Sequence, residues 1–109
     1  MDIETLREYA LSKPGVEEGF PFGPTALVFK VAAKMFLLFS MDTDPFQFNV
    51  KCDPEKAIEL REAYPDCILP GYHMNKKHWN TIVADGRLSA KQLKAFIDDS
   101  YALVAGKAR

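Results

Sequence analysis

The stretch ALVFKVAAKMFLLFSMDTDPFQFNVK, residues 26–51, decides the fold. Leu27, Phe29 and Val31 recur at every second position, which is the period of a β-strand with one better-buried face. The run MFLLFSM, residues 35–41, is almost continuously apolar, as expected for a central strand covered on both faces or nearly so. Alternation resumes in FQFNVK, which predicts a third strand.

Two short segments separate these strands. Ala32-Ala33-Lys34 has the length of a hairpin turn. Asp42-Thr43-Asp44-Pro45 combines side chains that cap local backbone with a proline that fixes φ. Because short turns can join only antiparallel neighbours, the three strands are predicted to form an antiparallel meander.

Helix signals flank this meander. Asp2 can cap a first helix, which Lys13-Pro14-Gly15 ends. Asp53-Pro54 opens a second helix with a cap followed by proline at the first helical position. Ser89 and Gln92 form a capping box at the start of the last helix, after which apolar residues recur at helical spacing.

Two more short strands complete the expected fold, at residues 67–70 and 79–83. The connection VEEGFPFGPT, residues 16–25, holds two prolines and two glycines, so we expect an irregular loop that Phe20 and Phe22 tether to the core. The sequence therefore predicts an α+β fold: an antiparallel sheet of about five strands, with the helices on one face and the other face partly exposed.

Composition indicates one ordinary globular domain over residues 1–109, with 48% hydrophobic and 27% charged residues. No apolar run approaches the ~20 residues that span a bilayer. The N-terminal MDIETLREYA carries acidic residues where a secretory signal would be basic, so we expect a cytoplasmic protein with reduced cysteines. The net charge of −1 gives no general attraction to nucleic acid, so any basic footprint must be local.

The segment GYHMNKKHWNTI, residues 71–82, is the strongest candidate for a binding surface. Its lysines can contact phosphates, its asparagines can present amides to base edges, and an exposed indole could stack on bases. Alternatively, the indole packs into the core and the lysines only keep an edge loop soluble. For the tryptophan we favour burial, while both interpretations of the lysines stay open. The side chains concerned are Asn75, Lys76, Lys77, Trp79 and Asn80.

No catalytic signature accompanies this segment. His73 and His78 are five residues apart, and no cysteine or carboxylate lies nearby at zinc-ligand spacing. Neither histidine has a serine or cysteine beside it, and no glycine-rich phosphate loop follows a strand. We therefore expect no enzyme, no catalytic residue, no metal site and no cofactor. A pocket enzyme built around Tyr72 and the two histidines is the least favoured interpretation.

Several short motifs, in this order and spacing, resemble the MmcQ/YjbR family of small bacterial proteins. The resemblance runs from Leu6 to about Val104, and its most specific part is GYHMNKKHW. One departure is Ala33, where the family often has glycine. The motifs are Pro14-Gly15-Val16-Glu17-Glu18, Pro21-Phe22-Gly23, Lys34-Met35-Phe36, residues 71–79 and Ser100-Tyr101.

The resemblance implies a CyaY-like (frataxin-like) arrangement of sheet and helices. It also implies DNA binding through a double wing, in which loops flanking the sheet grip the duplex. Iron binding of the frataxin type is not expected, because Asp2, Glu4 and Glu8 are too sparse and are interrupted by Arg7. The residues expected to contact nucleic acid are Lys30, Lys34, Lys51, His73, Asn75, Lys76, Lys77, His78 and Trp79.

Two hypotheses of function follow. The first is a monomeric, non-enzymatic protein that binds double-stranded DNA weakly and in a salt-dependent manner, through local lysines. The second is a small interaction module that binds a protein or peptide on the sheet face near Trp79.

Overall fold

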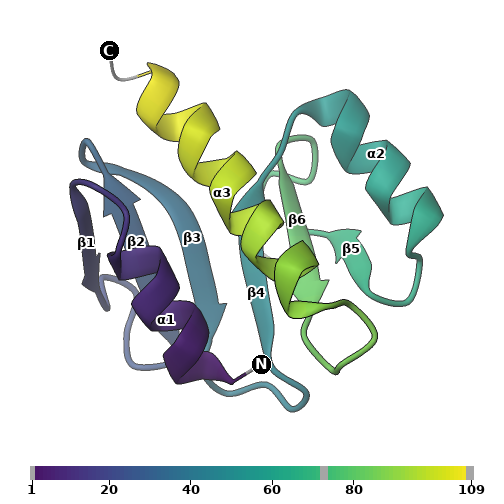
Figure 1. Cartoon of the computed structure of the whole chain (residues 1–109), viewed down its shortest axis with the longest axis horizontal. Helices are drawn as coiled ribbons and strands as arrows, with labels where there is room; N and C mark the ends of the chain where they lie inside the picture. Colours follow the sequence, from purple (N-terminus) through teal and green to yellow (C-terminus); the bar gives the residue numbers. More distant parts are fainter. Residues whose placement is uncertain (1, 72–73, 108–109) are drawn as a thin grey trace.

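The computed structural model describes residues 2–71 and 74–107, which form a six-stranded sheet and three helices (Figure 1). The strands pair antiparallel throughout, in the order β1-β2-β3-β4-β6-β5. The predicted α+β class is confirmed. The strands are β1 Val16–Gly19, β2 Ala26–Val31, β3 Lys34–Ser40, β4 Gln47–Lys51, β5 Ile68–Pro70 and β6 Trp79–Val83, and the helices are α1 Ile3–Leu11, α2 Pro54–Ala63 and α3 Ala90–Lys107.

The sheet holds one strand more than the sequence predicts. Residues 16–19, expected to be part of an irregular loop, form β1 and pair with β2 in the register Val16↔Val31 to Gly19↔Val28. The four strands β1 to β4 form the meander. The chain then passes through α2 to the far edge, where it forms β5, and returns as β6 between β5 and β4.

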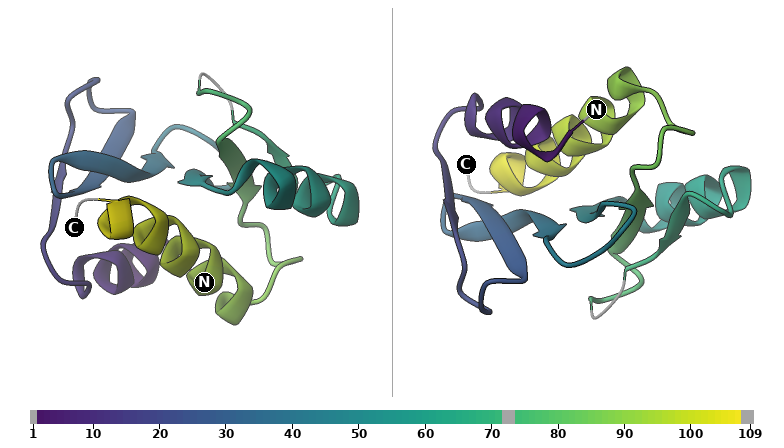
Figure 2. Two further views of the ribbon diagram at one scale, coloured as in Figure 1. Left: turned by 90° about the horizontal axis from the view of Figure 1, so that it is seen from above. Right: turned by 90° about the horizontal axis from the view of Figure 1, so that it is seen from below.

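All three helices lie on one side of the sheet. Figure 2 shows α1 and α3 against this side, and the view agrees with the packing of Leu6 and Ile97, which are fully buried. α2 packs beside β5 at the edge of the sheet, and Asn80 Nδ2 on β6 donates a hydrogen bond to the carbonyl oxygen of Ala57 in α2 (Figure 2). No helix formed by residues 2–71 and 74–107 is long and apolar enough to cross a membrane.

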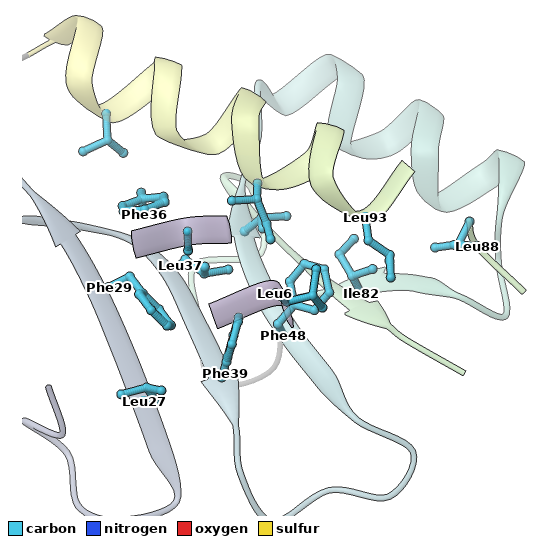
Figure 3. Close-up of a cluster of buried hydrophobic side chains, with 14 of the residues drawn as sticks. Leu6, Leu27, Phe29, Phe36, Leu37, Phe39, Phe48, Ile82, Leu88 and Leu93 are labelled. Atoms are coloured by element: carbon cyan, nitrogen blue, oxygen red, sulfur yellow. The ribbon is translucent and has the colours of Figure 1, made fainter. Parts of the chain in front are cut away.

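The core fills the space between sheet and helices, where side chains from β2, β3, β4 and β6 meet Leu6 and Leu93 (Figure 3). A bulge in β3 adds to it. Phe29 pairs with Leu37 and Lys30 with Met35, so Phe36 is the extra residue, and Phe36 and Leu37 are both fully buried. The apolar run is therefore central, as predicted.

The predicted helix starts are confirmed. The Asp2 carboxylate accepts from Thr5 N, and the Asp53 carboxylate accepts from Glu55 N and Lys56 N. Ser89 and Gln92 form the reciprocal hydrogen bonds of a capping box. These caps fix where α1, α2 and α3 begin.

Candidate functional site

The face of the sheet without helices carries a groove of about 790 Å³. It contains apolar side chains and neutral polar ones, and Asp42 is its only charged residue within the described part of the chain. Leu38, Asn49 and Thr81 lie on its floor and are almost fully buried. The groove is lined by Phe22, Thr25, Ala26, Met35, Leu38, Ser40, Asp42, Thr43, Gln47, Asn49, Met74 and Thr81.

A polar pair stands in this otherwise apolar floor. Asn49 on β4 and Thr81 on β6 are direct cross-strand partners, and Thr81 Oγ1 donates to Asn49 Oδ1 at 2.5 Å. Buried polar atoms are tolerated when they are hydrogen-bonded, so this pair fixes the register of β4 and β6 without destabilising the floor.

Two projecting segments border the groove. Figure 2 shows the β1–β2 connection and residues 74–78, which lead into β6, on the side of the sheet opposite α1 and α3. On the first, Phe20 and Phe22 are 52% and 68% exposed, so the expectation that they tether the loop to the core is wrong. Two prolines and a glycine surround Phe22, which lines the groove together with Met74 of the second segment.

Trp79 is the first residue of β6 and directly follows the second segment. It is 8% exposed, which confirms the prediction of burial and leaves its ring unavailable for stacking on a base. Gly71 lies directly on it: Gly71 N donates to the carbonyl oxygen of Trp79 at 2.9 Å. A Cβ at Gly71 would lie 2.8 Å from the Trp79 Cβ, so only glycine fits this approach.

Five lysines gather at one end of the sheet, and we call them the lysine end. The β2–β3 turn, the end of β4 and the start of β6 all lie at this end, at the top of Figure 1. Strand alternation places Lys30 and Lys51 on the groove side, opposite Met35 and Trp79 respectively. The lysine end consists of Lys30, Lys34, Lys51, Lys76 and Lys77.

None of these five lysines forms an ion pair with a described residue. Elsewhere on the surface Arg7, Lys13, Lys56 and Arg87 are paired with carboxylates, whereas Lys91 and Lys94 form no ion pair with a described residue. Lys51 is half-buried and the other four lysines are exposed. One carboxylate, that of Glu17, lies directly opposite Lys30 in the sheet. The lysine end therefore carries five lysines without an ion-pair partner among the described residues, with Glu17 on its β1 side and Asp53 shortly after β4.

The asparagines have structural roles that the sequence did not reveal. Asn75 Oδ1 accepts from Lys77 N at 3.0 Å, and its carbonyl oxygen accepts from His78 N and Trp79 N. Asn80 lies fully buried on the helix side, where its Oδ1 accepts from Arg61 Nε at 2.7 Å. The expectation that Asn80 presents its amide to bases is therefore wrong.

The remaining predicted contacts are dispersed. Lys34 pairs with Val31, whose buried side chain faces the helices, so Lys34 extends from the edge of that face. His78 is half-buried, and its carbonyl oxygen accepts from Cys52 N at 2.8 Å. His73 lies outside the described residues. Arg61 also donates to the carbonyl oxygen of Lys76, which fixes the lysine-bearing turn to α2.

Other reactive side chains are few. Cys52 and Cys67 are buried free thiols, and burial raises the pKa of Cys52. Among the described residues no group of three or more His, Cys, Asp or Glu side chains could hold a metal ion.

Comparison with known proteins gives the family. Residues 11–103 match the model of the YjbR family. The chain belongs to this family. This YjbR-family chain is 44% identical over 102 residues to the uncharacterized protein YbdF of Escherichia coli O157:H7, covering 93% of this chain and 82% of the relative. It is 33% identical over 101 residues to the uncharacterized protein YjbR of Escherichia coli K12, covering 93% and 85%.

Solved structures show the same fold. The Deinococcus radiodurans protein DR2400, a DUF419 domain, is similar with a TM-score of 0.92 and 40% identity, over 98% of this chain and 80% of that one. A crystal structure of a Pseudomonas syringae protein is similar with a TM-score of 0.78 and 28% identity, over 95% and 99%. The resemblance to the YjbR family predicted from the sequence motifs is thus confirmed.

Proposed function

We propose that this YjbR-family protein binds DNA without modifying it, and that the lysine end supplies the phosphate contacts. The observation that carries the proposal is the gathering of five lysines, none ion-paired with a described residue, at one end of the sheet. A lysine without a carboxylate partner can contact a phosphate without first breaking an ion pair. The turn that carries Lys76 and Lys77 is held by Arg61, which limits the ordering required on binding.

The same arrangement predicts a weak interaction. Few contacts release few counterions, and a protein of net charge −1 has no long-range attraction to a polyanion. Glu17 beside Lys30 further reduces the local potential. We expect micromolar or poorer affinity, lost steeply as salt is added, and hence a local role on DNA rather than coating of a chromosome.

Fluorescence anisotropy with labelled DNA tests the proposal. The parent is compared with the double variants Lys76→Ala/Lys77→Ala and Lys30→Ala/Lys51→Ala at low and moderate salt. Lys91→Ala is the matched control, because Lys91 is also exposed and forms no ion pair with a described residue, but lies in the first turn of α3 at the other end of the sheet. Each double variant should weaken binding roughly tenfold while the control leaves it unchanged. If the parent protein binds no DNA even at low salt, the proposal is wrong.

A second candidate is a peptide-binding module, which the apolar lining of the groove favours. Phe22, Met35, Leu38 and Met74 offer adaptable apolar contacts of the kind that protein interfaces use. This candidate function predicts that the parent protein does not bind DNA at any salt concentration. It also predicts that peptides selected from a display library lose binding on Phe22→Ala.

A further inference from the structure

We infer that the preferred ligand is single-stranded nucleic acid, whose bases occupy the groove while its phosphates lie on the lysine end. This inference rests on the proposed function and names the form of nucleic acid that the site accepts. It follows from the chemistry of the groove and from the position of the lysines relative to it.

The groove offers what unstacked bases need. Phe22 is 68% exposed at its rim, and an exposed aromatic ring can stack on any base. Met35 and Met74 add polarizable apolar contacts. Gln47 lines the groove, and its side-chain amide forms no hydrogen bond with a described residue, so it can donate to and accept from a base edge.

The lysines are arranged to contact a nucleic-acid strand that lies across the open face of the sheet. Met35 lines the groove, and its direct cross-strand neighbour is Lys30. Lys51 follows Asn49 by two residues on β4 and so shares its face. Phosphates next to bases at the Met35 end of the groove would therefore reach the lysine end, while Phe22 lies in the β1–β2 connection at the opposite end of β2. Asp42 lines the groove as its single described charge and repels phosphate there.

A duplex does not match this surface. Its outer surface is sugar and phosphate, and its base faces are covered by stacking. Seating a duplex in the groove would place phosphates against Phe22 and Leu38, where the groove lining offers no cation to replace their water. A single strand can turn its bases inward and keep its phosphates at the lysine end.

Anisotropy with a labelled 12-nucleotide oligothymidine and the matching 12-base-pair duplex tests the inference. The parent should bind the single strand about tenfold more tightly than the duplex. Phe22→Ala should weaken single-strand binding about tenfold and leave duplex binding unchanged. Phe20→Ala is the control, since Phe20 is exposed on the same loop but does not line the groove. A labelled abasic strand of the same length should bind like the duplex.

The outcomes separate this inference from the proposed function. Equal affinity for both forms, with Phe22→Ala without effect and the lysine variants impaired, overturns the inference and leaves the proposed function intact. Absence of binding to either form overturns both. Equal losses on Phe22→Ala and Phe20→Ala also overturn the inference, because the effect would then lie in the loop rather than in the groove. Circular dichroism of each variant establishes that the fold is retained.

Discussion

Replacing Ser100 with alanine should destabilise the protein by about 2–4 kcal/mol, because one buried hydroxyl serves two backbone groups. Ser100 is fully buried on α3, its Oγ donates to the carbonyl oxygen of Phe36, and it accepts from Lys51 N at 2.8 Å. Alanine would leave both groups without this partner, and each unsatisfied buried group costs about 1–3 kcal/mol. Lys51 N is only partly buried, so we place its share at the lower end of that range.

Urea unfolding measures this loss directly. With a slope of about 1–2 kcal/mol per molar for a domain of this size, the midpoint should fall by roughly 1–4 M while the slope stays constant. Ser12→Ala is the matched control: its Oγ donates to the carbonyl oxygen of Tyr9 at 2.6 Å in an exposed position, where water can replace it. We expect that control to cost less than about 0.5 kcal/mol. If Ser100→Ala lowers the free energy of unfolding no more than Ser12→Ala does, the argument that the buried backbone groups need the Ser100 hydroxyl as a hydrogen-bond partner is refuted.

Two further predictions concern stability. Ala33 has φ 65° in the β2–β3 turn, and a left-handed backbone conformation costs alanine about 1–2 kcal/mol. Ala33→Gly should therefore stabilise the protein by about 0.5–1 kcal/mol, because the larger entropy of the unfolded glycine chain offsets part of the gain. An unchanged or lower urea midpoint would contradict this prediction. Burial raises the pKa of Asp98, but hydrogen bonds from Lys13 at 2.5 Å and Tyr9 at 2.6 Å outweigh it, so the pKa lies below 3.8. The stabilisation that Asp98 provides is therefore present above its unfolded pKa and is lost as the pH falls through its folded pKa. Asp98→Asn should flatten the acid limb of a stability profile recorded from pH 6 to 3.

The strands and helix starts could be predicted because their signals are local. Alternation identifies a strand from its own residues, and Asp2, Asp53 and Ser89 cap the helices that directly follow them. β1 could not be recognised in this way. Its sequence VEEG has no clear alternation, and it is a strand because β2 supplies its hydrogen-bonding partners.

The groove was missed for a related reason. Phe22, Met35, Asn49 and Met74 are far apart in the sequence, and only the sheet register and the two projecting segments bring them together. Two prolines and two glycines hold Phe22 in an exposed position that its apolar character alone does not suggest. Each lysine could be predicted from the sequence as a candidate phosphate contact. Their common position at one end of the sheet could not, because it follows from the order of the strands.

The salt dependence of DNA binding tests the central claim most directly. If the lysines of the lysine end other than Lys34, which lies at the edge of the helix side, contact phosphates of a single strand, the logarithm of the association constant should fall with the logarithm of salt with a slope of about −2.8. The slope should become shallower by about 1.4 in Lys76→Ala/Lys77→Ala, and by a similar amount in Lys30→Ala/Lys51→Ala. An unchanged slope in both double variants, or no binding at the lowest salt, would contradict the assignment of phosphate contacts to the lysine end.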